Sequence, residues 1–531
     1  MKRCSRSVRE GPIETQSKID AIQKLEQVRL AQREWKRVPI KQRAKILGKV
    51  AARIVQRREV LAKSITAPMR TSYFETITAE LLPLAETAKW LSKTMARVLR
   101  TRHTSVWQTP MWLGSLRSEV RREALGTVLI IGTWNYPIFL TGSQLLHALA
   151  AGNGVVIKPA PGCEAVSAEL VDIVVASGVP RELVLVLDSR VEAAKLAIEV
   201  GVDHIVMTGS STSGRKVLEQ AASKLIPATM ELSGCDAVFV LPDADLDRVA
   251  DLLRFGLMLN GGATCIAPRR VFVPESLREA LEGKLRERLL APGCVDWKAP
   301  CSVSTIQMLD RVVSDAVAKG ATFLSASMRS ENSMHSENSM HSENGGILTR
   351  EREVGGSSPG SFASIAPVIL TGVNTEMEIY RLDVFAPVML IVPVASISQG
   401  VEWNRLCPYG LCVSIFGGEA QALAMESELN AGTVLINDFV VPTADPRLPF
   451  GGRGESGYGV TRGEEGLLAM SVPKVLTRRK GKWLPHSKLP QANDEQLLDG
   501  LLQLQHGEHL RDRFQGLRKV LRSVFRHDKK K

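Results

Sequence analysis

The sequence lacks the features that would place it in several large classes of proteins. No apolar run approaches the roughly 20 residues that cross a bilayer, and the N-terminal segment MKRCSRSVREGPIE has no apolar core of the signal-peptide kind. The eight cysteines form no CxxC pair and are joined by no histidine cluster. We therefore expect neither a disulfide framework nor a metal site, and we expect a cytoplasmic protein with reduced thiols.

The composition is that of a globular protein with an uneven excess of positive charge. Hydrophobic residues make up 44% of the 531 positions and charged residues 23%, which suits two or three domains. The net charge is +12, and residues 511–531 carry nine Lys and Arg against two Asp. Such an end can lie against an anionic membrane or nucleic acid, although a solvated tail is more common. No specific nucleic-acid binding is predicted.

The apolar spacing predicts an α/β fold. Helices are expected at 19–35 and 43–60, and residues 103–125 suit an extended arm or hairpin. Short apolar runs and helical stretches then alternate. The expected strands are 128–132, 155–158, 183–187 and 204–207, and the expected helices are 142–151, 165–177, 192–200 and one that opens at 209–214 and runs to about 224. This alternation predicts a Rossmann-type, doubly wound parallel sheet, which binds ligands at the carboxyl ends of its strands.

A second α/β series follows, with strands at 237–241 and 270–273 and helices at 246–258 and 276–290. It is interrupted by a polar insertion at 327–360, which opens with three copies of a hexapeptide, SM[RH]SEN, and which we interpret as disordered. We expect four parts: a cofactor-binding domain at 15–230 with its arm near 103–125, a catalytic domain at 231–435, a return and oligomerisation segment at 436–475, and a basic linker with a helical extension at 476–531.

Three residues carry candidate catalytic chemistry. Glu231 in ELSGCDA can activate water, and Cys265 in LNGGATCIAP can attack a carbonyl carbon. Asn135, after the strand at 128–132, offers a neutral amide that can stabilise a carbonyl oxygen as it gains charge. Taken one at a time, a buried small cysteine and a turn-forming asparagine are the more common roles.

Two further features suggest a dinucleotide site. The turn GSSTSG at 209–214 follows a strand and opens a helix, where backbone N–H groups can hold phosphate. Lys158 ends the strand at 155–158 and can reach ribose hydroxyls or a phosphate, although a solvated lysine is equally common at a strand end.

Taken in order, these strings resemble the aldehyde dehydrogenase superfamily over about residues 20–475. The matching strings are TWNYP at 133–137, IKP at 157–159, ELSG at 231–234, NGGATC at 260–265, DVFAP at 383–387, YGL at 409–411 and PFGGRGESGYG at 449–459. TWNYP begins early in the chain and IAP follows the cysteine, as in the shorter class 3 branch, whose members act on fatty or aromatic aldehydes and are commonly dimers.

The resemblance implies NAD(P)-dependent oxidation of an aldehyde through a thioester on Cys265. Asn135 and the Cys265 N–H would stabilise the oxyanion, and Glu231 would activate the hydrolytic water. The residues implied in binding NAD or NADP are Thr133, Trp134, Lys158, Gly209, Ser210, Gly214, Asp383 and Phe385. The implied partners are the aldehyde and a second copy of the chain.

Several positions depart from the family pattern. Pro161 stands where a glutamate commonly binds ribose, so the charge that would repel a 2′-phosphate is missing and NADP should be tolerated. Asp383 is one methylene shorter than the usual glutamate. Ala386, Ala263, Ser233 and Cys235 replace the usual glycine, glutamine, glycine and lysine. These changes favour an altered cofactor affinity, with the nucleophile, base and oxyanion donor retained.

Two alternatives stay open. One is a weakly active or inactive scaffold whose basic C-terminal extension contacts a partner or the surface of an anionic membrane. The other is a relative that reduces acyl groups or passes them to coenzyme A, against which Glu231 counts, because such members typically lack this glutamate.

Overall fold

The computed structural model describes residues 12–65, 70, 72–105, 109–110, 113, 116–324, 362–479, 489 and 494–527. The expected insertion at 327–360 lies outside these residues, as do most of the linker and the last lysines. The chain divides into two compact units, one of residues 1–99 and 123–472 and one of residues 100–122 and 473–531. None of the described helices is long and apolar enough to cross a membrane.

The larger unit contains a six-stranded sheet in the order β19-β7-β6-β3-β4-β5. Its strands are β3 (Thr127–Ile131), β4 (Gly154–Lys158), β5 (Val184–Val186), β6 (His204–Thr208), β7 (Ala228–Glu231) and β19 (Gly457–Tyr458). All neighbours are parallel except β19, which pairs antiparallel with β7. Strands β4 and β5 follow β3 on one side, whereas β6 and β7 lie on its other side, so the direction of winding reverses at β3. The predicted doubly wound fold is confirmed.

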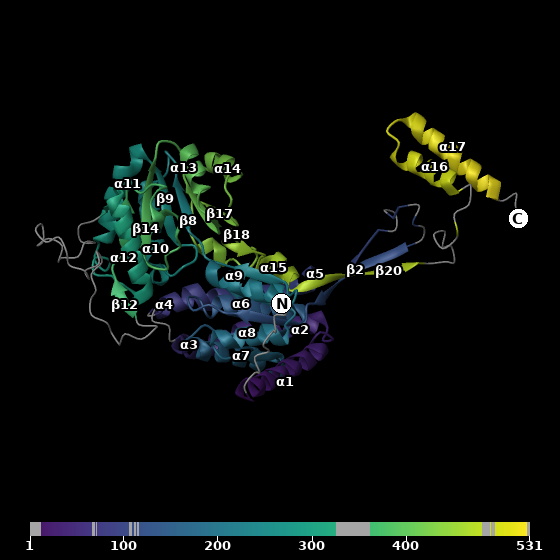
Figure 1. Cartoon of the computed structure of the whole chain (residues 1–531), viewed down its shortest axis with the longest axis horizontal. Helices are drawn as coiled ribbons and strands as arrows, with labels where there is room; N and C mark the ends of the chain where they lie inside the picture. The colour runs from purple at the N-terminus through teal and green to yellow at the C-terminus, as the bar shows by residue number, and fades with distance from the viewer. Residues whose placement is uncertain are drawn as a thin grey trace, which may run out of the picture. The chain divides into compact units, whose positions relative to one another are not determined.

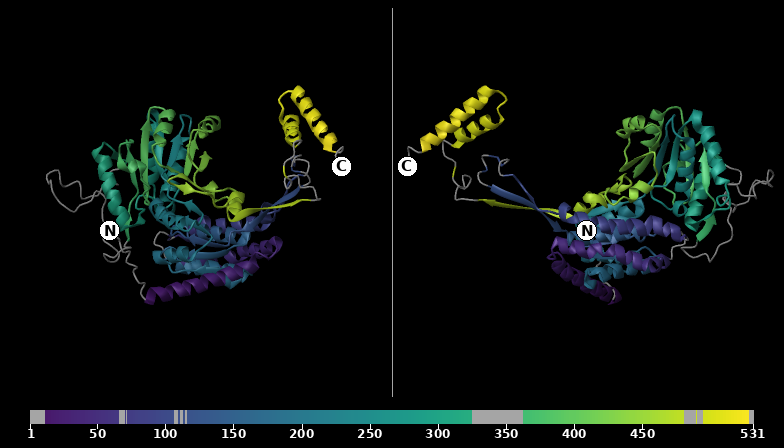
Figure 2. Two further views of the ribbon diagram at one scale, coloured as in Figure 1. Left: turned by 45° about the vertical axis from the view of Figure 1, so that its right-hand side comes forward. Right: turned by 180° about the vertical axis from the view of Figure 1, so that it is seen from behind.

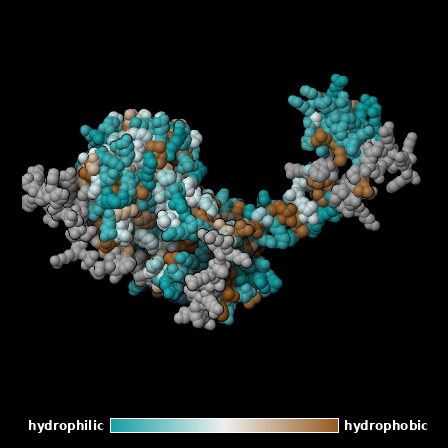
Figure 3. Space-filling view, in the orientation of Figure 1, coloured by the Kyte–Doolittle hydropathy of each residue, from teal (hydrophilic) through white to brown (hydrophobic). Residues whose placement is uncertain are grey.

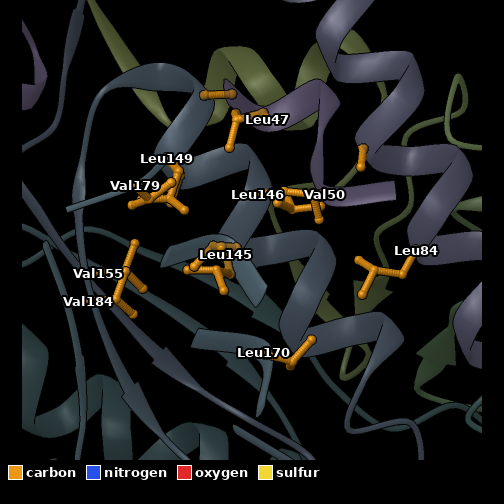
Figure 4. Close-up of a cluster of buried hydrophobic side chains, with 14 of the residues drawn as sticks. Leu47, Val50, Leu84, Leu145, Leu146, Leu149, Val155, Leu170, Val179 and Val184 are labelled. Carbon is orange, nitrogen blue, oxygen red and sulfur yellow. The ribbon is translucent and has the colours of Figure 1, made fainter. Parts of the chain in front are cut away.

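Helices cover both faces of this sheet (Figures 1 and 2). One face packs against α2 (Ile40–Gly48), α3 (Val50–Ser64), α5 (Leu82–Val98), α6 (Phe139–Ala151) and α7 (Glu164–Ser177). The other packs against α1 (Pro12–Trp35), α8 (Val191–Val200) and α9 (Ser211–Ala222). Figure 4 shows Leu145, Leu146 and Leu149 of α6 in the first of these cores, close to Val155 of β4. Strands buried on both faces explain the continuous apolar runs in the sequence.

The larger unit also contains a seven-stranded sheet, in the order β11-β13-β14-β9-β8-β16-β17. Its strands are β8 (Asp236–Val240), β9 (Pro268–Pro274), β11 (Thr322–Phe323), β13 (Val368–Thr371), β14 (Val388–Val394), β16 (Cys412–Phe416) and β17 (Thr433–Ile436). Helices α10 (Leu246–Met258) and α11 (Glu275–Leu289) cover one face. Helices α12 (Val303–Ala318), α13 (Ile397–Asn404) and α14 (Glu419–Glu426) cover the other.

The expected strands and helices of both α/β series are confirmed. The single helix expected at 43–60, before the first series, is corrected. There the structure has two helices, α2 and α3, that meet at Lys49. Lys49 itself keeps helical φ and ψ of −75° and −19°, and at Gly48 a Cβ would come within 3.2 Å of Ser92 on α5. The remaining short elements of the unit are α4 (Tyr73–Thr76), η1 (Ile77–Leu81), η4 (Arg181–Leu183), η5 (Leu259–Gly262), β10 (Ala299–Ser302), β12 (Phe362–Ile365), η8 (Glu378–Arg381), β15 (Tyr409–Gly410), η9 (Val441–Ala444), β18 (Arg453–Gly454) and α15 (Gly463–Ala469).

The smaller unit holds most of a three-stranded sheet and a pair of helices. The strands of the sheet are, in order, β1 (Arg102–His103), β2 (Leu116–Ala124) and β20 (Ser471–Arg479). Strands β1 and β2 lie in the segment near 103–125 that is expected to form an arm. Helices α16 (Asp494–His506) and α17 (Leu510–His527) pack against each other as a hairpin. Gly500 and Gly516 lie at the crossing, where a Cβ on Gly516 would come within 2.4 Å of the Leu504 nitrogen.

Candidate active site

The three candidate catalytic residues come from separate elements of the larger unit. Asn135 lies in the loop that joins β3 to α6, and Glu231 is the last residue of β7. Because β3 and β7 belong to one parallel sheet, their carboxyl ends open at the same edge. Cys265 lies in the loop between η5 and β9, just before an inner strand of the seven-stranded sheet.

Asn135 is tied to the cysteine loop through its own amide. Its Nδ2 donates to the carbonyl oxygen of Ala263 at 3.0 Å, and its Oδ1 accepts from the Thr133 hydroxyl at 2.7 Å. The side chain is buried. One N–H of Asn135 is thus used to fix the amide, and the second N–H is left for a carbonyl oxygen. Thr133, which the resemblance assigned to the cofactor, here donates to the Asn135 side chain and orients its amide.

Glu231 is buried, and three neutral side chains donate hydrogen bonds to it. Its Oε2 accepts from the Thr208 hydroxyl at 3.2 Å and from Gln144 Nε2 at 3.3 Å. Its Oε1 accepts from the Thr461 hydroxyl. Burial raises the pKa of the carboxyl, while the Arg462 charge and the three hydrogen bonds lower it. A carboxylate whose pKa is moved toward neutrality suits a general base.

Cys265 is partly exposed, but its surroundings disfavour the thiolate. Desolvation raises the pKa of the thiol to about 12, with further contributions from the charges of Asp236, Glu231 and Asp383. Only a small opposing effect comes from Arg462. Attack by the sulfur near neutral pH therefore requires a base that removes the thiol proton.

Arg462 is a functional candidate that sequence reasoning missed. It is buried, its guanidinium carbon lies 4.5 Å from the Phe450 ring centroid and 5.2 Å from that of Phe139, and its Nη1 donates to the Thr443 carbonyl. Its charge lowers the pKa of both Glu231 and Cys265. Arg462 lies three residues beyond the string PFGGRGESGYG, and no local spacing distinguishes it from a surface arginine.

The cofactor candidates of the first sheet lie at its carboxyl edge. Lys158 ends β4 and is buried, which lowers its pKa, while Glu164 and Asp188 raise it. Ser210 caps α9, because its hydroxyl accepts from the Ser213 N–H at 3.2 Å. Gly209 precedes this cap, and its N–H donates to the Glu231 carbonyl oxygen at 3.1 Å. Backbone N–H groups at a helix start are the groups that can hold phosphate. Gly214 lies inside α9, where a Cβ would come within 2.9 Å of Leu232.

Asp383 and Phe385 lie in the second sheet's part of the unit. The Phe385 ring meets Trp134 edge-on at 5.9 Å between centroids. Burial raises the pKa of Asp383 to about 6, and Arg269 opposes this from 3.7 Å. Oδ1 of Asp383 accepts no hydrogen bond from the residues that the structure describes. A buried carboxylate oxygen without a donor fits a ribose hydroxyl, so these residues are compatible with a nucleotide cofactor.

The larger unit is thus an α/β fold of two helix-covered sheets that carries a partly exposed thiol, a buried carboxyl group and a buried amide. The model of the aldehyde dehydrogenase family matches residues 11–476, and the chain belongs to this family. The predicted superfamily, fold and NAD(P)-dependent class of enzyme are therefore confirmed.

Individual relatives are distant but span nearly the whole chain. The chain is 28% identical to 4,4'-diapolycopene aldehyde oxidase of Methylomonas sp, over 90% of this chain and 86% of the relative. It is 26% identical to NADP-dependent glyceraldehyde-3-phosphate dehydrogenase from Bacillus halodurans, solved with NADP, with a TM-score of 0.73 over 87% of this chain and 91% of that one. A Mycobacterium tuberculosis aldehyde dehydrogenase solved with NAD+ has a TM-score of 0.75 at 22% identity, over 88% and 92% of the two chains, and shows the likeness of the fold.

Proposed function

We propose that this chain oxidises an aldehyde to the carboxylic acid through a thioester on Cys265, with NAD or NADP as hydride acceptor. The observation that supports the proposal is that Asn135 and Glu231, from two different strand ends, both act on the loop of Cys265. The amide of Asn135 is already bonded to the loop of the cysteine, and the charge of Glu231 already acts on the sulfur.

The protein groups divide the reaction as follows. Glu231 accepts the thiol proton, and the sulfur of Cys265 forms a bond to the carbonyl carbon. The second N–H of Asn135 and the backbone N–H of Cys265 hold the negative oxygen. A bound nicotinamide supplies the chemistry of hydride acceptance. Glu231 releases the thiol proton to solvent and then takes a proton from water, the water oxygen bonds to the thioester carbon, and the carbon–sulfur bond breaks to release the acid and the Cys265 thiolate, which is reprotonated.

In this proposal Thr133 and Trp134 border the cofactor, Lys158 binds the adenosine ribose, and Asp383 and Phe385 lie at the nicotinamide ribose. Gly209 and Ser210 lie against the pyrophosphate, and Gly214 lets α9 pack closely. The same proposal assigns residues 15–230 to cofactor binding, 231–435 to catalysis, 436–475 to the return segment and 476–531 to the extension. The parallel strands β3, β4, β5 and β6 fall in the first range, and β7 ends one residue beyond it.

The test is turnover of medium-chain and aromatic aldehydes, followed by the absorbance of the reduced nicotinamide. We expect turnover in the wild type and none in Cys265→Ala. Cys294→Ala is the matched control, because Cys294 is also partly exposed, and it should keep full activity. Glu231→Gln should slow both the first burst of reduced nicotinamide and steady-state turnover, by about 10²- to 10⁴-fold, because Glu231 serves both steps. A fully active Cys265→Ala variant would refute the proposal.

We further propose a substrate that is a fatty or aromatic aldehyde, as in the class 3 branch. The IAP string after Cys265 and the early position of TWNYP support it, as does the relative named 4,4'-diapolycopene aldehyde oxidase. A homodimer is proposed on the same resemblance, and the sedimentation velocity of the purified protein tests it. Transfer of the acyl group to coenzyme A that exceeds hydrolysis would favour the acyl-transferring alternative instead.

A second candidate function rests on the α16–α17 hairpin. Leu510, Phe514, Leu517 and Leu521 of α17 are exposed among arginines, which is the pattern of a helix that lies on an anionic membrane. We propose peripheral contact of this hairpin with the cytoplasmic face of a membrane. If membrane contact is the main function, the aldehyde dehydrogenase fold serves as a weakly active or inactive scaffold. A folded wild-type protein that binds neither NAD nor NADP would support this alternative.

A further inference from the structure

Arg70 is a buried arginine that contacts both loops of the proposed site. Its side chain is 3% exposed. Its Nη2 donates to the Asn135 carbonyl oxygen at 2.8 Å, and its Nε donates to Asn260 Oδ1 at 3.2 Å. One guanidinium therefore joins the loop of the oxyanion donor to the turn that precedes Cys265.

Asn260 completes the connection from the other side. It adopts a left-handed conformation with φ 51°, followed by Gly261 and Gly262 with φ of 63° and 75°. In this turn Asn260 Nδ2 donates to the Asn135 carbonyl at 3.0 Å and to the Ala263 carbonyl at 3.2 Å. Ala263 is also the acceptor of the Asn135 amide. Arg70 and Asn260 thus hold one end of Asn135, while Ala263 holds the other.

Arg70 also reaches toward Cys265 through an aromatic ring. Its guanidinium carbon lies 5.2 Å from the centroid of the Tyr136 ring. The Tyr136 hydroxyl and the Thr264 hydroxyl form a hydrogen bond of 2.7 Å, and Thr264 immediately precedes Cys265. Arg70 is therefore connected to residues next to both Asn135 and Cys265.

The charge of Arg70 is matched by Glu80, which is fully buried. Glu80 Oε1 lies 3.3 Å from Arg70 Nη2. Glu80 Oε2 accepts from the N–H groups of Ile138 and Phe139 at 2.8 and 2.7 Å, at the start of α6. Burial raises the pKa of Glu80 to about 7, and Arg70 opposes this. Loss of Arg70 would therefore favour the protonated, neutral form of Glu80. A variant without Arg70 need not bury an unpaired charge at Glu80.

We propose that Arg70 is a positioning residue that holds the amide of Asn135 against the Cys265 loop, so that the oxyanion donor is in place before substrate binds. This inference rests on the proposed function, because it assumes that Asn135 stabilises the oxyanion. Oxyanion donors act through preorganisation, and a misplacement of about 1 Å costs about 10²-fold in rate. The planar fork of arginine donates to two acceptors at fixed angles, whereas lysine offers a single ammonium.

A double-mutant cycle tests the proposal. The variants are Arg70→Met, Asn135→Ala and the double variant, and the measured quantity is the rate of the first burst of reduced nicotinamide at saturating aldehyde. We expect losses of about 10²- to 10³-fold for Asn135→Ala and about 10- to 10²-fold for Arg70→Met. The double variant should be no slower than Asn135→Ala alone, with an unchanged KM for the cofactor. Losses that multiply would overturn the proposal.

Arg43→Met is the matched control, because Arg43 is also a buried arginine, 5% exposed, and among the described residues it makes no hydrogen bond to Asn135. Any loss that it causes should multiply with that of Asn135→Ala. Thermal unfolding shows whether Arg70→Met folds. If it does not, Arg70→Lys replaces it in the double-mutant cycle. A loss in Arg70→Lys that multiplies with that of Asn135→Ala would likewise overturn the proposal. An Asn135→Ala variant with a full burst rate would instead refute the assumed role of Asn135.

Discussion

The hydroxyl of Thr461 donates a hydrogen bond to Glu231, although 230 positions of sequence separate the two residues. An antiparallel bridge between Phe450 and Thr461, with both N···O distances at 2.8 Å, holds the threonine in place. The bond favours the charged carboxylate, and burial favours the neutral acid. The proton affinity of the proposed base is therefore set partly by a residue from the far end of the family region.

Thr461→Val should move the pH dependence of hydrolysis. Loss of the donor raises the pKa of Glu231 further. A base must be deprotonated to act, so activity is lost as the pH falls through this pKa, and a higher pKa moves the acidic limb of kcat to higher pH. Near neutral pH the thioester should hydrolyse roughly tenfold more slowly, a change of about 1.4 kcal/mol.

The measurement is kcat against pH for the wild type, Thr461→Val and Thr461→Ser. Serine keeps the hydroxyl, so its profile should stay near that of the wild type. Equal shifts in the serine and valine variants would mean that the shape of the side chain, and not its hydrogen bond, sets the limb.

The contrast between Glu231 and Thr461 explains what the sequence could and could not predict. Glu231, Cys265 and Asn135 stand in recognisable strings, and the parallel sheet brings the ends of those strings to one edge. Thr461, Arg462 and Arg70 act through side-chain contacts with residues more than 60 positions away. Such contacts leave no local spacing, so only the folded chain identifies them.

The same reasoning applies to helix boundaries. The spacing in 43–60 predicted one helix because both α2 and α3 keep apolar residues toward the same core. The division at Lys49 carries no glycine or proline signal at that residue, and Lys49 keeps helical φ and ψ, so the apolar spacing alone does not identify it. By contrast, α10 begins at Leu246 after the Asp245 cap, whose side chain accepts from the N–H of Arg248. Local chemistry of that kind can be identified in the sequence.

Pro161→Glu should reduce the use of NADP. Pro161 is exposed in the turn after β4, three residues beyond Lys158. A carboxylate there would repel a 2′-phosphate and could accept from a ribose hydroxyl. We expect KM for NADP to rise about tenfold, or ~1.4 kcal/mol, and KM for NAD to stay equal or fall.

Pro161→Gln separates the effect of charge from the loss of the proline ring. The glutamine variant should bind NADP more tightly than the glutamate variant, as initial rates against cofactor concentration would show. If both variants change KM for NADP equally, the charge at position 161 does not control the choice of cofactor.

Gly516→Ala should destabilise the α16–α17 hairpin. Alanine normally favours a helix over glycine by about 1 kcal/mol. Here its Cβ would come within 2.4 Å of the Leu504 nitrogen and 2.7 Å of the Gly500 oxygen, so the helices must separate, at a cost of about 1–3 kcal/mol. Hydrogen exchange of the α16 and α17 amides should quicken.

The matched control is Gly283→Ala in α11, where the added Cβ meets no described atom within 4 Å. That variant should leave exchange in the hairpin unchanged and slightly stabilise its own helix. Slower exchange in Gly516→Ala would show that the crossing tolerates a wider spacing of the two helices.

The hairpin should also bind anionic vesicles. Leu510 is 83% exposed and Phe514 68%, and in Figure 3 the visible face of the hairpin is largely hydrophilic with apolar atoms at its edge. Insertion of the apolar side chains and attraction of the arginines should act together. We expect the wild type to sediment with vesicles of phosphatidylserine and phosphatidylcholine, and to remain in solution with phosphatidylcholine alone.

Two variants separate the contributions of these side chains. Phe514→Ser removes apolar contact and should weaken vesicle binding about tenfold, since a buried aromatic side chain contributes roughly 1.5–3 kcal/mol. Arg518→Gln keeps the apolar residues and should make binding less sensitive to salt, because screening acts on exposed charges. Aldehyde turnover should be equal in the wild type and both variants. Equal sedimentation of the wild type and Phe514→Ser would exclude α17 as the membrane contact and leave a solvated hairpin.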